Sequence, residues 1–162
     1  MYDDEFELTF DLSDEDKASR APAPEPAAET EPPVEAVPEP AVPAANGRCV
    51  LISGGDRGIG AAAARAFWQA GYRVAVLYHT HAEEAAALEK ALPGLLAVQC
   101  DVASRASCEV AFHTVEQAVG HVDVLVSNAG IAQQKLFTDI TPEEWQHMLD
   151  VNLSGAFHLC QL

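Results

Sequence analysis

Glycines in the segment SGGDRGIG (53–60) are the first residues whose type and spacing indicate chemistry. The segment follows the apolar run CVLI (49–52), and a helical pattern begins within it. A glycine-rich turn between a buried strand and a helix lets a diphosphate approach the backbone and meet the free N–H groups of the helix. We expect a positive φ at Gly54, close approach of phosphates at Gly58, and tight packing of the helix on the strand at Gly60. Taken alone, the Gly-x-x-x-Gly-x-Gly spacing fits a plain structural turn equally well.

The residues after position 46 must supply the elements that hold this turn, and they alternate between strand and helix patterns. Four short apolar runs predict strands, at 48–53, 73–78, 95–102 and 122–130, the last of which runs into a turn. Four longer, amphipathic segments predict helices, at 58–71, 82–94, 104–120 and 141–162. Strands without a polar face, separated by helices, indicate a parallel sheet that is covered on both sides. Right-handed crossovers then predict an α/β fold, a Rossmann-like doubly wound sheet in the order 3-2-1-4.

Residues 1–46 differ sharply in composition from the rest of the chain. They hold most of the prolines, no glycine, and most of the excess acid in a net charge of −16. Such a segment cannot bury enough apolar area to offset its ordering entropy, which predicts a disordered acidic tail before a domain at 47–162. Within the tail, apolar residues alternate with polar ones over 6–12. This alternation also fits a short motif that binds a partner protein as an added strand or helix.

Charge, hydropathy and cysteine spacing exclude several classes of protein. The acidic balance argues against nucleic acid and membrane surfaces as partners. No apolar run approaches the about 20 residues of a membrane span, and no secretion signal is evident, so we expect a cytoplasmic protein. His79 and His81 lie two apart without a third ligand nearby, so we expect no metal site. The cysteines lack Cys-x-x-Cys spacing, which favours buried, reduced thiols at Cys49, Cys100, Cys108 and Cys160.

Four segments in the same order resemble the short-chain dehydrogenase/reductase family over residues 48–162. The first turn of that family reads Thr-Gly-x-x-x-Gly-Ile-Gly, and Ser53 keeps the hydroxyl of its Thr. CDV (100–102) resembles the adenine contact of the family, and SNAG (127–130) resembles its Asn-Asn-Ala-Gly. DVNLSGAF (150–157) resembles the segment that carries its catalytic Asn, which would be Asn152. The resemblance implies that the cofactor is bound by Ser53, Gly54, Arg57, Gly58, Ile59, Gly60, His79, Asp101, Val102, Asn128, Ala129 and Gly130.

The resemblance also indicates which cofactor is bound, NADP(H). NAD-binding members carry an Asp at the end of the second strand, whereas Tyr78 stands there in this chain. Arg57 resembles the basic residue that pairs with the 2′-phosphate in NADP-preferring members. His79 stands where many of those members have a second Arg. It would be a weaker, pH-dependent partner, and a solvated loop histidine fits the sequence equally well.

The family's proton donor is a Tyr that is assisted by a Lys four residues later. A Ser orients the substrate, the Asn holds a water through its backbone, and hydride comes from the nicotinamide. No Tyr in this chain has a Lys at that spacing. We therefore expect that this chain is the N-terminal part of a longer reductase and that it is inactive by itself. In such a fragment the apolar run VDVLVS (122–127) would form an open sheet edge that favours aggregation.

The leading functional hypothesis is an NADP(H)-dependent carbonyl reductase of the 3-oxoacyl-acyl-carrier-protein reductase-like group. Its substrate would be a small or carrier-bound ketone or aldehyde, and the full-length protein would be a homo-oligomer, unlike the fragment. AGIAQQKLFTDIT (129–141) resembles members that reduce the aminopentanone group on elongation factor P. The alternative hypothesis is a non-catalytic nucleotide-binding or regulatory protein whose acidic tail recruits a partner. A third interpretation places the start of the protein near Asn46.

Overall fold

The computed structural model describes residues 45–162, so the predicted tail lies almost wholly outside the described residues, and its motif at 6–12 lies entirely outside them. The division into a tail and a domain therefore stays a prediction. Within the described range the strands form one parallel sheet in the order β3-β2-β1-β4, which confirms the predicted order. The strands are β1 (Cys49–Ser53), β2 (Arg73–Tyr78), β3 (Leu96–Gln99) and β4 (Val124–Ser127).

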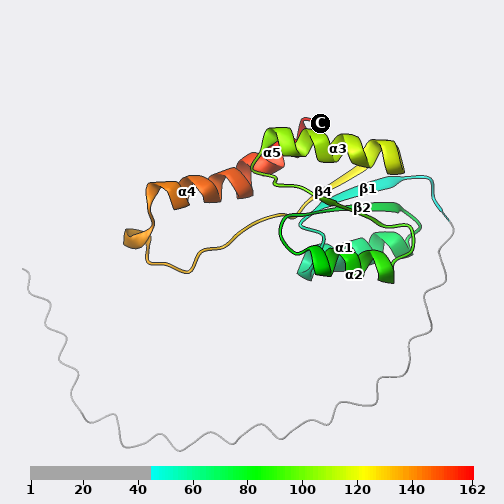
Figure 1. The fold of residues 1–162 in the computed structure, drawn as a ribbon, viewed down its shortest axis with the longest axis horizontal. Coiled ribbons are helices and arrows are strands. Elements are labelled where there is room, and N and C mark those ends of the chain that lie inside the picture. Colours follow the sequence, from blue (N-terminus) through cyan, green and yellow to red (C-terminus); the bar gives the residue numbers. More distant parts are fainter. Residues whose placement is uncertain (1–44) are drawn as a thin grey trace, which may run out of the picture. The chain divides into compact units, whose positions relative to one another are not determined.

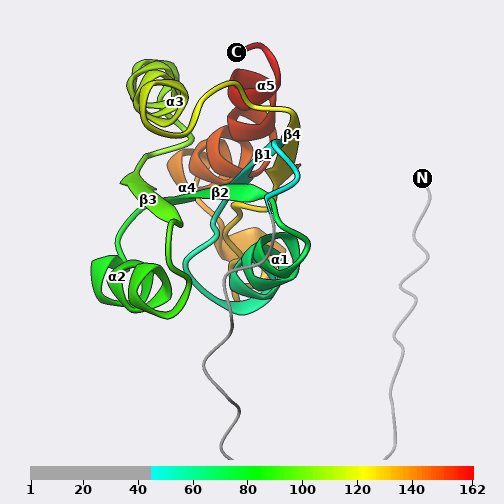
Figure 2. The ribbon, with the colours of Figure 1, turned by 90° about the vertical axis from the view of Figure 1, so that its right-hand side faces the viewer.

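Helices cover both faces of this sheet, as the doubly wound prediction requires. Figures 1 and 2 show helices on both sides of the strands. One face carries α1 (Gly58–Gln69) and α2 (Ala82–Ala91), and the other carries α3 (Arg105–Val119) and α5 (Gly155–Cys160). No helix among residues 45–162 is both long and apolar enough to span a membrane.

Two apolar cores result from the alternation of side chains along β1 and β2. On one face, Val50 and Val76 pack with Trp68 of α1 and other residues of α1 and α2. On the other face, Leu51 and Leu77 pack with residues of α3 and α5. Both central strands are therefore buried on both sides, which is why their sequences read as uninterrupted apolar runs.

The third and fourth strands are shorter than predicted. β3 ends at Gln99 because the next residues already form a turn, in which the Asp101 carboxylate accepts the backbone N–H of Ala103 at 3.0 Å. β4 begins at Val124 and ends at Ser127. In the described part of the chain β4 pairs with β1 alone, and its apolar residues are only half-buried.

The predicted helix at 141–162 is divided by a π-helical turn. It consists of α4 (Pro142–Leu149), the π-helix η3 (Asp150–Ser154) and α5. A short 3₁₀ helix, η2 (Phe137–Asp139), precedes it and was not predicted. π-Turns inside α-helices are frequent at functional sites, and this one holds the predicted catalytic Asn152.

Thr141 begins α4 with a complete capping box. Its hydroxyl accepts the N–H of Glu144, and the Glu144 carboxylate accepts the N–H of Thr141 at 3.0 Å. A hydrogen bond from Lys135 holds the pKa of Glu144 below its usual range, so the carboxylate stays ionised in this role. The predicted cap is confirmed.

Replacing Thr141 with Ala should destabilise the domain by about 1 kcal/mol, because the first turn of α4 loses its cap. Urea unfolding followed by circular dichroism measures this change. Thr114→Ala is the matched control, since that exposed hydroxyl on α3 donates only to the Val110 carbonyl of the same helix. We expect the control to change the free energy of unfolding by less than about 0.5 kcal/mol. Equal losses in both variants would contradict the capping role.

Candidate functional site

The glycine turn between β1 and α1 has the backbone that the sequence predicts. Gly54 and Gly58 have φ angles of 61° and 54°, which glycine adopts without strain. A Cβ on Gly58 would meet no other atom within 4 Å, so the chain leaves open space at this point. A Cβ on Gly60 would lie 2.0 Å from the Gly54 carbonyl oxygen. Gly60 therefore permits close packing, but against the turn rather than against the strand.

Gly55 is a further requirement of this turn that the sequence analysis missed. A Cβ on this residue would lie 2.6 Å from two atoms of the Val76 side chain on β2. Only a residue without a side chain lets the turn lie so close to the neighbouring strand. No local sequence signal shows this, because the contact depends on the pairing of β1 with β2.

Ser53 and Asn128 fasten the ends of β1 and β4 together. The buried Ser53 hydroxyl accepts the backbone N–H of Asn128 at 3.0 Å and of Ala129 at 3.1 Å. In return, the Asn128 amide donates to the Ser53 carbonyl at 3.1 Å and to the Gly54 carbonyl at 2.8 Å. These four hydrogen bonds hold the glycine turn and the turn after β4 together at the carboxyl ends of the strands.

Replacing Ser53 with Ala should destabilise the domain by about 1–3 kcal/mol, because two N–H groups lose their acceptor. Ser53→Thr is the matched variant, since it restores the hydroxyl that the resembling family carries at this position. Thermal unfolding of the two variants beside the unchanged chain measures the difference. If the Ala variant were as stable as the Thr variant, the hydroxyl would not be the fastening group.

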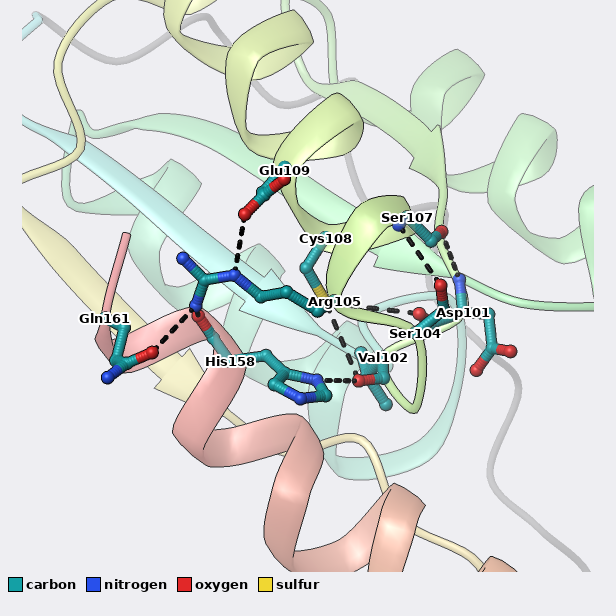
Figure 3. Close-up of polar contacts among 9 residues, drawn as sticks. All are labelled: Asp101, Val102, Ser104, Arg105, Ser107, Cys108, Glu109, His158 and Gln161. Carbon is teal, nitrogen blue, oxygen red and sulfur yellow. Dashed lines mark hydrogen bonds and ion pairs between the residues drawn. The ribbon is translucent and has the colours of Figure 1, made fainter.

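The turn after β3 is held by α3 and α5, as Figure 3 shows. The Ser107 hydroxyl accepts the N–H of Asp101 at 3.0 Å. The Val102 carbonyl accepts from Nδ1 of His158 at 3.0 Å, and Arg105 donates to the His158 carbonyl at 3.0 Å. These contacts fix the Asp101–Val102 segment, which sequence analysis placed at the adenine.

Three of the four cysteine thiols are buried in the apolar core. Burial raises the pKa of the Cys108 thiol to about 12, and burial also raises the pKa values of Cys49 and Cys100. These three residues are buried and unpaired, as predicted. Cys160 is also unpaired but exposed, so the prediction that it is buried is wrong. It follows the last buried residue of α5, where the helix ends at the surface.

Asn152 contacts the loop that follows Gly130. Its side-chain oxygen accepts the N–H of Ile131 at 2.9 Å, and its amide nitrogen donates to the Ile131 carbonyl at 3.0 Å. The side chain is therefore occupied in fixing this loop. Only the backbone of Asn152 is left for the water-holding role that the sequence analysis assigned to it.

The turns at the carboxyl ends of the strands enclose a cavity of about 380 Å³. Of the predicted residues, Ser53, Gly60 and Asn152 do not line the cavity but support the turns that do. Nine further residues of the wall were not among the predicted site residues: Asp56, Leu77, Tyr78, Thr80, His81, Cys100, Ile131, His147 and Val151. The predicted residues that line the cavity are Gly54, Arg57, Gly58, Ile59, His79, Asp101, Val102, Asn128, Ala129 and Gly130.

The shape and chemistry of this cavity fit a dinucleotide. It lies at the carboxyl ends of parallel strands, where open α/β sheets bind such ligands. No side chain caps the first turn of α1, so its N–H groups remain available to a phosphate beside the open space at Gly58. The same wall carries Tyr78 at the end of β2, His79 directly after it, and the cationic side chain of Arg57.

Comparison with known proteins agrees with this geometry. The chain is 40% identical over 112 residues to an acetoacetyl-CoA reductase of Shinella zoogloeoides, covering 69% of this chain and 46% of that protein. It is 40% identical over 114 residues to the 3-oxoacyl-[acyl-carrier-protein] reductase MabA of Mycobacterium bovis, covering 70% and 43% of the two chains. The chain thus spans about half the length of the curated relatives it matches.

Solved structures and a family model point the same way. A short-chain dehydrogenase/reductase from Serratia marcescens superimposes with a TM-score of 0.68 at 30% identity, covering 71% of this chain and 49% of that one. The model of the short chain dehydrogenase family matches residues 48–162, which contain all four segments on which the resemblance was based. The chain therefore belongs to the short-chain dehydrogenase/reductase family of oxidoreductases.

Proposed function

We propose that the protein is an NADP(H)-dependent reductase that converts the ketone of a 3-oxoacyl thioester into an alcohol. One observation carries this proposal: the glycine turn, the turn after β3 and the turn after β4 line one cavity that suits a dinucleotide. The names of the relatives support the substrate class, because they are reductases of acetoacetyl-CoA and of 3-oxoacyl-[acyl-carrier-protein]. In the cell we expect this activity in the cytoplasm, where such thioesters and NADPH are available.

Each part of the cavity has a role in this proposal. The N–H groups at the start of α1 would bind the diphosphate, with Gly58 leaving room for it. Arg57 would bind the 2′-phosphate through charge-assisted hydrogen bonds. Asp101 and Val102 would contact the adenine, and Asn152 would keep the Ile131 loop in place beside the nicotinamide end. The bound cofactor supplies the hydride.

Assembly of the protein into a homo-oligomer is part of the proposal. Large apolar side chains are exposed along the helical stretch from α4 to α5, including Trp145, Leu153 and Phe157. A contact between copies would remove these side chains from water. The substrate would be small or carrier-bound, in keeping with the names of the relatives.

The test is reduction of a 3-oxoacyl thioester by the protein that the gene encodes in full. We expect oxidation of NADPH when acetoacetyl-CoA is added, and slower oxidation of NADH. Elongation factor P that carries an aminopentanone group serves as a second substrate, because the 129–141 segment predicts it. If NADPH were oxidised only when the modified elongation factor P is added, that protein would be the assigned substrate. Absence of oxidation with either substrate would overturn the proposed reductase activity.

A second candidate function is nucleotide binding without reaction. The observation that favours it is a fact of the sequence, since no Tyr is followed four residues later by Lys. The same experiment separates the two functions. Tight NADPH binding without oxidation in the presence of either substrate would support a binding protein.

A further inference from the structure

Asp56 is a buried carboxylate in the cavity wall to which neither the proposed reaction nor the resembling motif gives a role. Its side chain is only 6% exposed, and it lies on the glycine turn directly before Arg57. Among residues 45–162 its ion-pair partner is His81, whose Nδ1 lies 3.4 Å from the carboxylate. One long contact leaves most of the acceptor capacity of a buried carboxylate unused.

The unused acceptor positions favour one kind of ligand group over another. A carboxylate accepts hydrogen bonds from hydroxyl groups, such as those of a ribose, but it repels a phosphate. Arg57, the next residue, has the opposite preference. The two neighbours therefore act in opposite directions on a 2′-phosphate bound at this end of the cavity.

His81 is the neighbour whose charge bears on the Asp56 carboxylate. The imidazole is 36% exposed, and its Nδ1 also lies 3.4 Å from the Thr80 hydroxyl. A protonated ring offsets the carboxylate charge, whereas a neutral ring leaves it uncompensated. Histidine changes its charge near physiological pH, so this balance responds to modest changes in pH.

Other titratable groups share the cavity or the start of α2 and have to be separated from this pair. His79 and the 2′-phosphate itself are also ionisable groups. Variants of Asp56 and His81 leave both of these groups unchanged, which makes the pair separable by experiment. The remaining groups are Arg57, Tyr78, Glu83, Glu84, Cys100, Asp101 and His147.

We propose that Asp56 and His81 together tune the choice between a cofactor with a 2′-phosphate and one without it. The Asp56 carboxylate disfavours the 2′-phosphate, and a proton on His81 relieves this effect. The preference for NADPH over NADH is then stronger in mildly acidic solution than in mildly alkaline solution. This inference rests on the proposed binding of a nicotinamide dinucleotide in the cavity.

The test is calorimetric titration with NADPH and with NADH at about pH 6 and about pH 8, which bracket the ordinary histidine pKa. Asp56→Asn should tighten NADPH binding about threefold to tenfold at the higher pH and less at the lower pH. NADH affinity should stay the same or fall slightly, because the amide is a weaker acceptor for a ribose hydroxyl. His81→Gln should weaken NADPH binding more at the lower pH than at the higher pH.

His79→Gln is the matched control, since it removes a neighbouring imidazole of the same cavity wall. The effect of Asp56→Asn on NADPH binding should persist when it is combined with this control substitution. If Asp56→Asn changed NADPH and NADH binding equally, or changed neither, the inference would be overturned while cofactor binding stood. If the unchanged chain bound neither cofactor, the proposed function would fail and the inference with it.

Discussion

Replacing Gly58 with Val should abolish the binding of both NADPH and NADH. The φ of 54° and the open space beside the Cα are the two features that a branched side chain removes at once. The valine would occupy the space in which we propose that the diphosphate lies, and it would strain a left-handed backbone position. Equilibrium titration with each cofactor measures the loss, which should exceed about 100-fold, or about 3 kcal/mol.

Gly94→Val is a control variant that introduces the same backbone strain without filling space in the cavity. Gly94 also has a positive φ, of 85°, and a Cβ there would meet no atom within 4 Å, but it lies in the turn before β3 and does not line the cavity. We expect a comparable decrease in unfolding free energy in both variants, and loss of cofactor binding in the Gly58 variant alone. Cofactor binding by the Gly58 variant as strong as by the Gly94 variant would refute the proposed diphosphate position.

Arg57→Ala should weaken NADPH binding by about 1–3 kcal/mol and leave NADH binding nearly unchanged. The side chain is exposed at the cavity, on the residue that precedes α1, and makes no cap to the helix. Its proposed function is a charge-assisted hydrogen bond to the 2′-phosphate, which NADH lacks. Fluorescence titration with the two reduced cofactors gives the ratio of their dissociation constants.

Arg65→Ala is the matched control, because it removes the same charge from an exposed position further along α1, outside the cavity. It should change the affinity for both cofactors by less than about threefold, since screening weakens distant exposed charges. An equal loss of NADPH and NADH binding in the Arg57 variant would rule out the 2′-phosphate role. The cofactor preference would then have to come from another residue.

Local sequence patterns predicted most of the fold because the central strands are buried on both faces. β2 has the predicted bounds, since its apolar run lies between the turn at Gly71 and the polar loop at His79. The cap at Thr141 could also be predicted from the sequence, because a capping box is a local signal. The π-turn η3 was not predicted, since the residues 150–154 carry no pattern that distinguishes it from α-helix.

The candidate site was predictable where motifs exist and not where contacts are long-range. The resemblance identified the segments that line the cavity, but not how they are fastened. The hydrogen bonds that the Ser53 hydroxyl accepts from Asn128 and Ala129 join residues 75 and 76 positions apart. The contact between Asp56 and His81 likewise depends on how the turns after β1 and β2 lie beside one another. Such contacts follow from the packing of the sheet, which no short sequence window contains.

The central claim is that this chain binds a nicotinamide dinucleotide with a 2′-phosphate. The most direct measurement is calorimetric titration of the 162-residue chain with NADPH and, separately, with NADH near neutral pH. We predict binding of one NADPH per chain, at least about tenfold tighter than NADH, a difference of about 1.4 kcal/mol. Tighter binding of NADH, or no binding of either cofactor by a folded chain, would contradict the account.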